Sequence, residues 1–204
     1  MTEPVDWPAR LTSSLHPLDA PLADLTVGGF RPPGGPWQPR PAAVLIAIVP
    51  DPTPAVVLTV RGPDMAMHAG QVSLPGGGRC GDERFPVVTA LRECAEEVGL
   101  AAERVRLLGL LDHFDTISAY RVTPVVGWVD TTVCLQACPR EVREVFTVPL
   151  SQVLALDSYR RHFIQRDGHH YEFWSMKLAA PWPVWGATAA ILRELALRYA
   201  KADH

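Results

Sequence analysis

Apolar residues form short runs that are bounded by prolines, glycines and polar residues. Ala42–Val49 and Ala55–Val60 are rich in β-branched side chains, and the segment Pro50–Pro54, with three prolines, separates them. Apolar runs of this length, separated by prolines, predict two strands joined by a rigid turn. Val105–Leu111 and Tyr120–Val129 have the same character and predict two more strands.

A second pattern predicts a β-hairpin in the C-terminal third of the chain. Two runs, Tyr159–Gln165 and His170–Lys177, flank the dipeptide Asp167-Gly168. Asp-Gly favours the tight turns that connect antiparallel strands, because both central residues of such a turn adopt positive φ.

Three segments have helical character instead. The first runs from about Pro86 to Val98, with proline at its start and Gly99 just past its end, which are the residues preferred at those two positions. Leu150–Leu156 predicts a short helix and Trp185–Lys201 a long amphipathic one. Strands interrupted by helices predict a mixed α/β domain built in layers.

The N-terminal part of the chain differs from the rest in its proline content. Of 20 prolines, 13 lie in the first 63 residues, and residues 31–41 contain too many to form a helix or a central strand. We therefore divide the chain into a proline-rich extension, residues 1–40, and a domain, residues 41–204. We expect one short helix in the extension and packing of Trp7, Leu11, Leu15 and Trp37 on the domain.

Composition excludes several classes of protein. With 48% hydrophobic residues among 204 and a net charge of −3, the chain is too apolar to be disordered and not basic enough to coat nucleic acid. No apolar run approaches the roughly 18–20 residues of a membrane helix, and the N-terminus lacks a signal-peptide pattern. Four sparse cysteines predict a reducing cytoplasm. We expect no nucleic-acid or membrane partner, and the oligomeric state is left open, with a homodimer as one option.

The helix predicted at 86–98 carries a concentrated set of acids. At about 100° per residue, Glu96 lies about 60° to one side of Glu93 and Glu97 about 40° to the other. Most charged helix faces are simply solvated. Here, however, Glu93 and Glu97 repel each other at i, i+4 spacing, and Asp82 and Glu83 precede the helix. A divalent cation would remove this repulsion, and carboxylates favour Mg²⁺ or Mn²⁺ over zinc. The acidic strip therefore predicts a metal site for phosphoryl chemistry.

These residues resemble the signature of the Nudix hydrolases. The resemblance rests on Gly77, Glu83, Arg92-Glu93, Glu96-Glu97 and Gly99-Leu100, although Glu83 and Arg92 are one residue further apart than in the signature. The resemblance implies an α/β/α sandwich with a mixed β-sheet. It also implies a hydrolase that cleaves a nucleoside diphosphate linked to another group.

A narrower resemblance concerns the subfamily that cleaves coenzyme A. It rests on Leu58–Arg61, His68–Gly77, Val122–Gly127, Glu141–Leu150 and Trp185–Leu195. The longer spacing before Arg92 also fits this subfamily. The chain departs from it at Ala66, where the subfamily has an arginine that would hold a substrate phosphate.

The resemblance assigns roles to individual residues. Metal ligands would be Glu93, Glu96, Glu97 and Glu83; the base that accepts the proton of water would be Glu93 or Glu141. Arg92 would hold the acidic cluster in register, and Glu97 would belong to the catalytic group. Substrate-binding residues would be Arg61, His68, Gln71, Gly76 and Gly77.

We expect Mg²⁺ or Mn²⁺ as cofactor and coenzyme A or acyl-CoA as substrate, cleaved to phosphopantetheine and adenosine 3′,5′-bisphosphate. The alternatives are hydrolysis of ADP-ribose, a dinucleotide or a nucleoside triphosphate, and an inactive nucleotide-binding module.

Simpler interpretations remain open for several residues. Arg61 fits a phosphate-binding cation and a solvated strand end equally well. We expect His113–Asp115 to form a satisfied loop and Cys134-x-x-x-Cys138 not to bind zinc, because no second ligand pair follows. Trp185 is placed under the last helix rather than against an adenine.

Overall fold

The computed structural model describes residues 5–30, 37–50, 53–63, 68–129, 133–166, 169–178 and 182–202. Its helices are α1 (Trp7–Thr12), α2 (Val87–Val98), α3 (Leu150–Leu154) and α4 (Ala187–Ala202), with single 3₁₀ turns at Leu22–Asp24, Ala102–Arg104 and Leu156–Ser158. None of the helices in these ranges has both the length and the apolar composition needed to cross a bilayer.

The described strands form two sheets, which we call sheet A and sheet B. Sheet A contains β1 (Val27–Gly29), β2 (Arg40–Val49), β3 (Ala55–Arg61), β4 (Val72–Ser73), β5 (Gly76–Gly78), β6 (Val105–Leu110), β7 (His113–Asp115), β8 (Tyr120–Val129) and β9 (Val142–Pro149). Its main path is β1-β7-β8-β2-β3-β4, while β5 pairs with β2, β6 with β8 and β9 with β3. Sheet B contains β10 (Tyr159–Arg166), β11 (His169–Met176) and β12 (Val184–Trp185).

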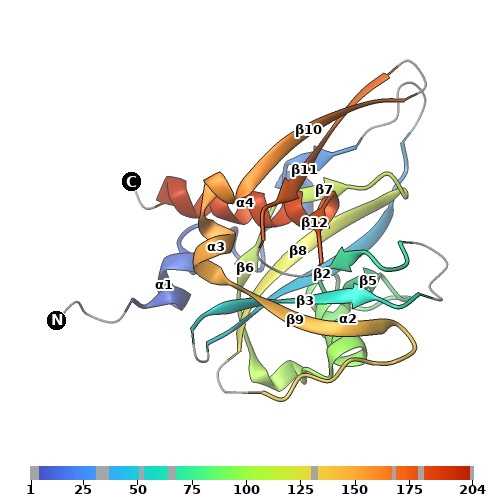
Figure 1. Ribbon diagram of the computed structural model, residues 1–204. Helices are drawn as coiled ribbons and strands as arrows, with labels where there is room; N and C mark the ends of the chain where they lie inside the picture. Colours follow the sequence, from blue (N-terminus) through green and yellow to red (C-terminus); the bar gives the residue numbers. More distant parts are fainter. Residues whose placement is uncertain are drawn as a thin grey trace.

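The central strand β2 explains the layered arrangement. It runs parallel to β8 and antiparallel to β3, so sheet A is mixed. Because side chains of a strand alternate between faces, Ile46 and Ile48 enter one core cluster while Leu45 and Ala47 enter the other. Helix α4 and sheet B cover the first face and α2 covers the second, as Figure 1 shows. The predicted α/β sandwich with a mixed sheet is confirmed.

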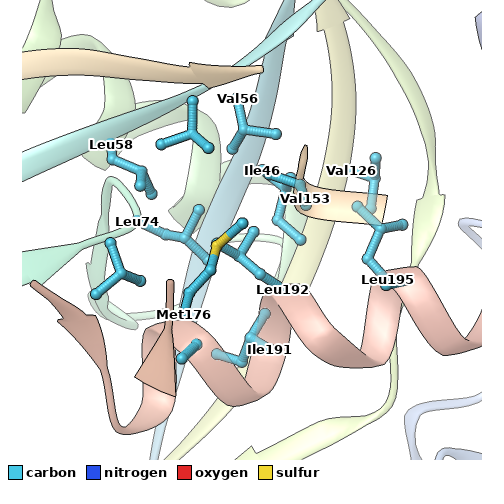
Figure 2. Packing of buried hydrophobic residues seen from close by; sticks show 14 of the residues in the cluster. Ile46, Val56, Leu58, Leu74, Val126, Val153, Met176, Ile191, Leu192 and Leu195 are labelled. Atoms are coloured by element: carbon cyan, nitrogen blue, oxygen red, sulfur yellow. The ribbon is translucent and has the colours of Figure 1, made fainter. Parts of the chain in front are cut away.

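The larger core cluster lies between α4 and sheet A. In Figure 2, Ile191, Leu192 and Leu195 of α4 project toward Ile46 and Val126 of the sheet. Leu192 and Leu195 are fully buried, so this apolar stripe of α4 is what attaches the helix to the domain.

Most predicted elements are present at nearly the predicted positions. The four predicted strands correspond to β2, β3, β6 and β8, the three helices to α2, α3 and α4, and the hairpin to β10 and β11. The turn residues Asp51 and Pro52 of the first strand pair, and Asp167 and Gly168 of the hairpin, lie outside the described residues.

Other predictions are wrong in detail. The glycines after Pro75, a sequence that favours a loop, instead form a short strand, β5, because their lack of side chains lets them pair closely with β2. His113–Asp115 forms strand β7 instead of a loop, although His113 is satisfied as expected by Leu22 and Thr123. Trp185 belongs to β12 and is 43% exposed, so it does not pack under α4.

The N-terminal segment, residues 5–30 together with Trp37, is joined to the domain by side-chain packing, strand pairing and a hydrogen bond. Helix α1 is capped by Asp6, whose Oδ1 accepts a hydrogen bond from the Ala9 N–H at 3.1 Å, and its Leu11 is fully buried. Strand β1 pairs in parallel with β7. Trp37 donates its indole N–H to Asp115 at 2.8 Å. The division of the chain at residue 40 stays a prediction.

One polar cluster connects this segment with α4. The carboxylate of Asp112, between β6 and β7, accepts hydrogen bonds from Arg198 of α4 at 2.6 Å and from the Thr26 N–H at 2.9 Å, and it lies 3.0 Å from His16. Burial by itself would raise the pKa of Asp112, but hydrogen bonds from Arg198, His16 and Thr26 outweigh it and lower the pKa to about 2.

We therefore expect Asp112→Asn to destabilise the protein at neutral pH by about 1.5–3 kcal/mol, the usual range for hydrogen bonds to a charged group. Because the folded pKa lies below the unfolded value of 3.8, this stabilisation is present above about pH 4 and is lost as pH falls toward 2. Urea unfolding at pH 7 and pH 3 measures it. A difference between wild type and variant that stays constant over this range would contradict the assignment.

Candidate active site

The site is built around α2, whose ends are fixed by its sequence. The helix follows Pro86 and ends at Gly99, which adopts φ +70° and donates its N–H to the carbonyl of Ala95. This left-handed position suits glycine, because a Cβ would be strained there. Thr89, Ala90, Cys94 and Val98 are buried, and Arg92, Glu93 and Glu96 lie on the side toward the N-terminal loop.

Arg92 organises the acids on this side of the helix. Its Nε lies 3.2 Å from Glu83, and its Nη1 lies 2.9 Å from Glu93 and 3.1 Å from Glu96. Its Nη2 also donates to the carbonyl of Gly78 in β5 at 3.2 Å. Arg92 thus joins the helix, the preceding loop and β5, and these contacts suit the positioning role that the resemblance implies for it.

Glu83 is bound by several donors at once. Its carboxylate accepts hydrogen bonds from Arg92, from the Thr89 hydroxyl at 2.5 Å and from the Cys80 N–H at 2.8 Å. The hydrogen bond from Arg92 is the main reason why the pKa of Glu83 falls to about 2. The sequence patterns do not single out Thr89, although it lies one helical turn before Glu93 and the same helical wheel places it beside the acids.

Glu97 lies in a different environment from the other acids. A charged helix face predicts exposure to solvent, but this is wrong for Glu97, whose side chain is 3% exposed. At the edge of the acidic strip Glu97 lies next to β5, whose Gly76 N–H donates to it at 3.3 Å. Desolvation raises the pKa of Glu97 to about 7, and nearby Glu93 and Glu141 contribute to the rise, while Arg61 and Gly76 oppose it.

Glu93 is the neighbour of Glu97 in the site. Burial also raises its pKa, with Arg92 acting in the opposite direction and Glu96 and Glu141 adding to the rise. Gly77 of β5 approaches the Glu93 carboxylate so closely that a Cβ at Gly77 would lie 2.5 Å from its Oε1. Glycine at position 77 therefore leaves room for the Glu93 carboxylate.

Three of the residues predicted to bind substrate, Arg61, His68 and Gln71, lie at the end of β3 and in the loop that follows, while Gly76 and Gly77 belong to β5. The Arg61 N–H donates to the carbonyl of Gln71, and His68 Nδ1 lies 3.0 Å from Gln71 Oε1. Arg61 Nη1 lies 4.0 Å from Glu97 Oε1, and its Nε is buried without a hydrogen-bond partner among the described residues. Ala66 lies outside the described residues.

Glu141 enters the same region from the segment before β9. Its carbonyl accepts the Gly62 N–H at 2.8 Å, which fixes it beside the loop that follows Arg61. Its carboxylate is exposed, yet close enough to raise the pKa values of both Glu93 and Glu97. The tertiary structure therefore brings Arg61, Glu93, Glu97 and Glu141 to one end of sheet A from three separate parts of the sequence.

The predicted metal ligands are not all equivalent in this arrangement. No group of three or more His, Cys, Asp or Glu side chains in the described ranges is positioned to hold a metal ion as it stands. Glu83, Glu93 and Glu96 all face Arg92, and the ligand roles of these acids and of Glu97 stay predictions. Glu93 and Glu97 fit a hard divalent cation better, because both are desolvated carboxylates that repel each other and Glu141.

The expectation that Cys134 and Cys138 do not bind zinc stays a prediction. Cys134 and Cys138 are both free thiols, and they belong to no potential metal-binding cluster among the residues described.

Comparison with known proteins finds similar sequences and a similar fold. The family model described as "NUDIX domain" matches residues 39–167. A protein of Pectobacterium atrosepticum described as "Uncharacterized Nudix hydrolase NudL" is 40% identical over 161 residues, covering 79% of this chain and 83% of that protein. One of Escherichia coli (strain K12 / DH10B) with the same description is 41% identical over 159 residues, covering 78% and 82%. The crystal structure of a MutT/nudix family protein from Enterococcus faecalis has a similar fold, with a TM-score of 0.50 at 16% identity, covering 84% of this chain and 66% of that chain.

Proposed function

Because the chain belongs to the Nudix hydrolases, which act on pyrophosphate bonds of small nucleotide substrates, we propose that it hydrolyses the diphosphate of coenzyme A or an acyl-CoA. Water adds to one phosphorus atom and the P–O bond of the anhydride breaks. The products are phosphopantetheine and adenosine 3′,5′-bisphosphate.

The observation that carries this proposal is the position of Arg61. Its guanidinium lies beside the buried carboxylate of Glu97, and its Nε has no partner among the described residues although it is buried. A buried donor without an acceptor is costly, and a phosphate oxygen is the acceptor that a guanidinium binds best. Arg61 also belongs to the sequence segments that resemble the coenzyme A subfamily.

The roles of the other residues follow from their contacts. Glu93 and Glu97 would hold a divalent cation such as Mg²⁺, which when bound neutralises diphosphate charge and orients the attacking water. Arg61 binds a phosphate oxygen, and Arg92 keeps Glu93 and β5 in position. Glu93 or Glu141 accepts the proton of the water, since both acids lie near Glu97.

A substrate panel tests the proposal directly. The purified protein is incubated with coenzyme A, acetyl-CoA, ADP-ribose, a diadenosine polyphosphate and ATP, each with Mg²⁺ or Mn²⁺, and the products are separated by chromatography. We expect coenzyme A or acetyl-CoA to give the highest kcat/KM, with phosphopantetheine or its acyl derivative among the products. If ADP-ribose is cleaved rapidly and coenzyme A is untouched, the substrate assignment is wrong.

A second substrate class is favoured by one feature of the sequence. Ala66 occupies the position of an arginine that in the coenzyme A subfamily would bind a substrate phosphate, so ADP-ribose or a dinucleotide is the alternative substrate. An inactive binding module is disfavoured because Arg92, Glu93, Glu96 and Glu97 are all present. Saturable nucleotide binding with no turnover of any substrate in the panel would support the module instead.

We further propose that the protein works in the cytoplasm. Its four cysteines are free thiols, and two of them are exposed, which suits a reducing compartment.

A further inference from the structure

A row of aromatic rings lies on the outward face of sheet B. The ring of His162 stacks on Phe173, with centroids 4.9 Å apart and planes 15° from parallel. Phe173 in turn contacts Trp185 edge-to-face, with centroids 6.1 Å apart. Trp185 ends this row, which we call the ring row, and its side chain is 43% exposed. None of these three residues has a role in the site described above.

Strand register explains why the rings face outward together. His162 pairs directly with Phe173, and Trp185 pairs with Ser175, two residues further along β11. Their neighbours Met176 and Val184 face the opposite way and are buried in the core. The ring row is also held in place, because His162 Nε2 lies 2.7 Å from the Ser175 hydroxyl. Trp185 is therefore an exposed aromatic ring at the end of an ordered row.

Trp185, the exposed end of the ring row, lies near the end of sheet A that carries the candidate active site, on the side of the sheet that α4 and sheet B cover. The Thr188 hydroxyl, three residues after Trp185, donates to the carbonyl of Val72 in β4 at 3.0 Å. The residue before Val72 is Gln71, whose carbonyl accepts the Arg61 N–H. Three residues of chain span at most about 10 Å, so Trp185 cannot lie far from this strand end.

A second contact places the far end of sheet B over the same edge. Tyr171 of β11 contacts Phe30, with centroids 5.5 Å apart, and Phe30 directly follows β1. The Phe30 N–H donates to the carbonyl of Asp115, the last residue of β7. The carbonyl of Ala119, just before β8, accepts the Arg40 N–H at the start of β2. The contact of Thr188 in α4 with β4 and the contact of Tyr171 in sheet B with Phe30 thus both lie at the end of sheet A where β2 begins and where β3 ends at Arg61.

We propose that the ring row is the surface on which the purine base of the substrate stacks, with Trp185 as the ring that contacts it. This inference rests on the proposed function, since it assumes that the phosphates bind at Arg61. A planar base gains affinity from an ordered aromatic face without specific hydrogen bonds. Trp185 is exposed, belongs to a fixed row and is tied through Thr188 and β4 to the strand end that carries Arg61.

The test compares Trp185→Ala with Trp185→Phe and with a matched control. Phe163→Ala removes an exposed aromatic ring from the same hairpin, but from the opposite face, where Phe163 pairs with Glu172. Calorimetry measures binding of AMP, which has a purine base but no anhydride to cleave, and of inorganic phosphate, which has no base. Steady-state kinetics on the best substrate of the panel gives KM and kcat, and thermal unfolding verifies that each variant is folded.

We expect Trp185→Ala to weaken AMP binding and raise KM on the order of tenfold, with kcat and phosphate binding unchanged. Trp185→Phe should restore most of the loss, and Phe163→Ala should behave as wild type. Equal AMP affinity in wild type and Trp185→Ala would overturn the inference, as would a loss of AMP affinity that Phe163→Ala shares. So would a change from dimer to monomer on Trp185→Ala with unchanged AMP affinity. Weakened AMP binding in a protein that ignores coenzyme A would instead refute only the choice of coenzyme A.

Discussion

Replacing Glu97 with glutamine is expected to reduce kcat on the order of a hundredfold or more while the protein stays folded. The side chain is nearly isosteric, but the amide cannot supply the negative charge with which Glu97 would bind a divalent cation. The Glu97 side chain is 3% exposed and lies beside Arg61 and Gly76. Solvent water therefore has little access to the position from which the charge is removed. Steady-state kinetics with varied Mg²⁺ or Mn²⁺ measures the loss and a weaker dependence on metal.

The same substitution should not destabilise the metal-free protein at pH 8. Burial raises the pKa of Glu97 from 4.5 in the unfolded chain to about 7 in the folded one. A raised carboxyl pKa means that stability is retained below about pH 4.5 and is lost as pH rises through 7. The loss is on the order of 3 kcal/mol when the group is fully ionised. Urea unfolding in the presence of a chelator should therefore show the variant at least as stable as wild type at pH 8.

Glu103→Gln is the matched control for this prediction. Glu103 is exposed, lies outside the site in the 3₁₀ turn before β6, and should show wild-type kinetics after substitution. Turnover near the wild-type rate in Glu97→Gln would refute the assignment of Glu97 to the site.

Replacing Gly77 with alanine should lower kcat between about tenfold and a hundredfold with little effect on stability. A Cβ at this position would lie 2.5 Å from Oε1 of Glu93, which is the free end of a flexible side chain. The carboxylate can move away at low cost, but it then leaves the position beside Glu97. Kinetics and thermal unfolding of the same preparation separate these two effects.

Gly76→Ala provides the contrast, because there the obstacle is backbone. Its Cβ would meet the Ala43 carbonyl and lie 2.6 Å from the Val44 Cα, so β5 could not stay paired with β2. We expect this variant to lose about 1–3 kcal/mol of stability. If Gly77→Ala were as unstable as Gly76→Ala and equally active after correction for folded protein, the proposed effect on Glu93 would be wrong.

Local sequence determines much of this fold. Local signals predict the positions of β2, β3, β8 and α2: runs of apolar residues, the prolines and glycines that interrupt them, and the residues preferred at helix ends. These signals are local because hydrophobic periodicity and residues such as Gly99 act within a few residues of the chain. Short strands carry no such local signal: β5 consists of three glycines and exists only because β2 lies beside it. The prediction for Trp185 is wrong for a similar reason, since pairing with β11 competes with the start of a helix.

In the candidate site, too, local sequence determines one part of the arrangement and tertiary structure the other. Spacing along one helix is enough to group Glu93, Glu96 and Glu97 and to indicate metal and phosphate chemistry, because i, i+3 and i, i+4 neighbours share a face whatever surrounds them. The different surroundings of these acids are decided by tertiary structure. Glu97 becomes buried against β5 and has Arg61 of β3 beside it, whereas Glu83, Glu93 and Glu96 are bound by Arg92. Burial and long-range contact set the pKa and the partner of each carboxylate. Neither is encoded in spacing along the chain, since both depend on which distant strands fold against the helix.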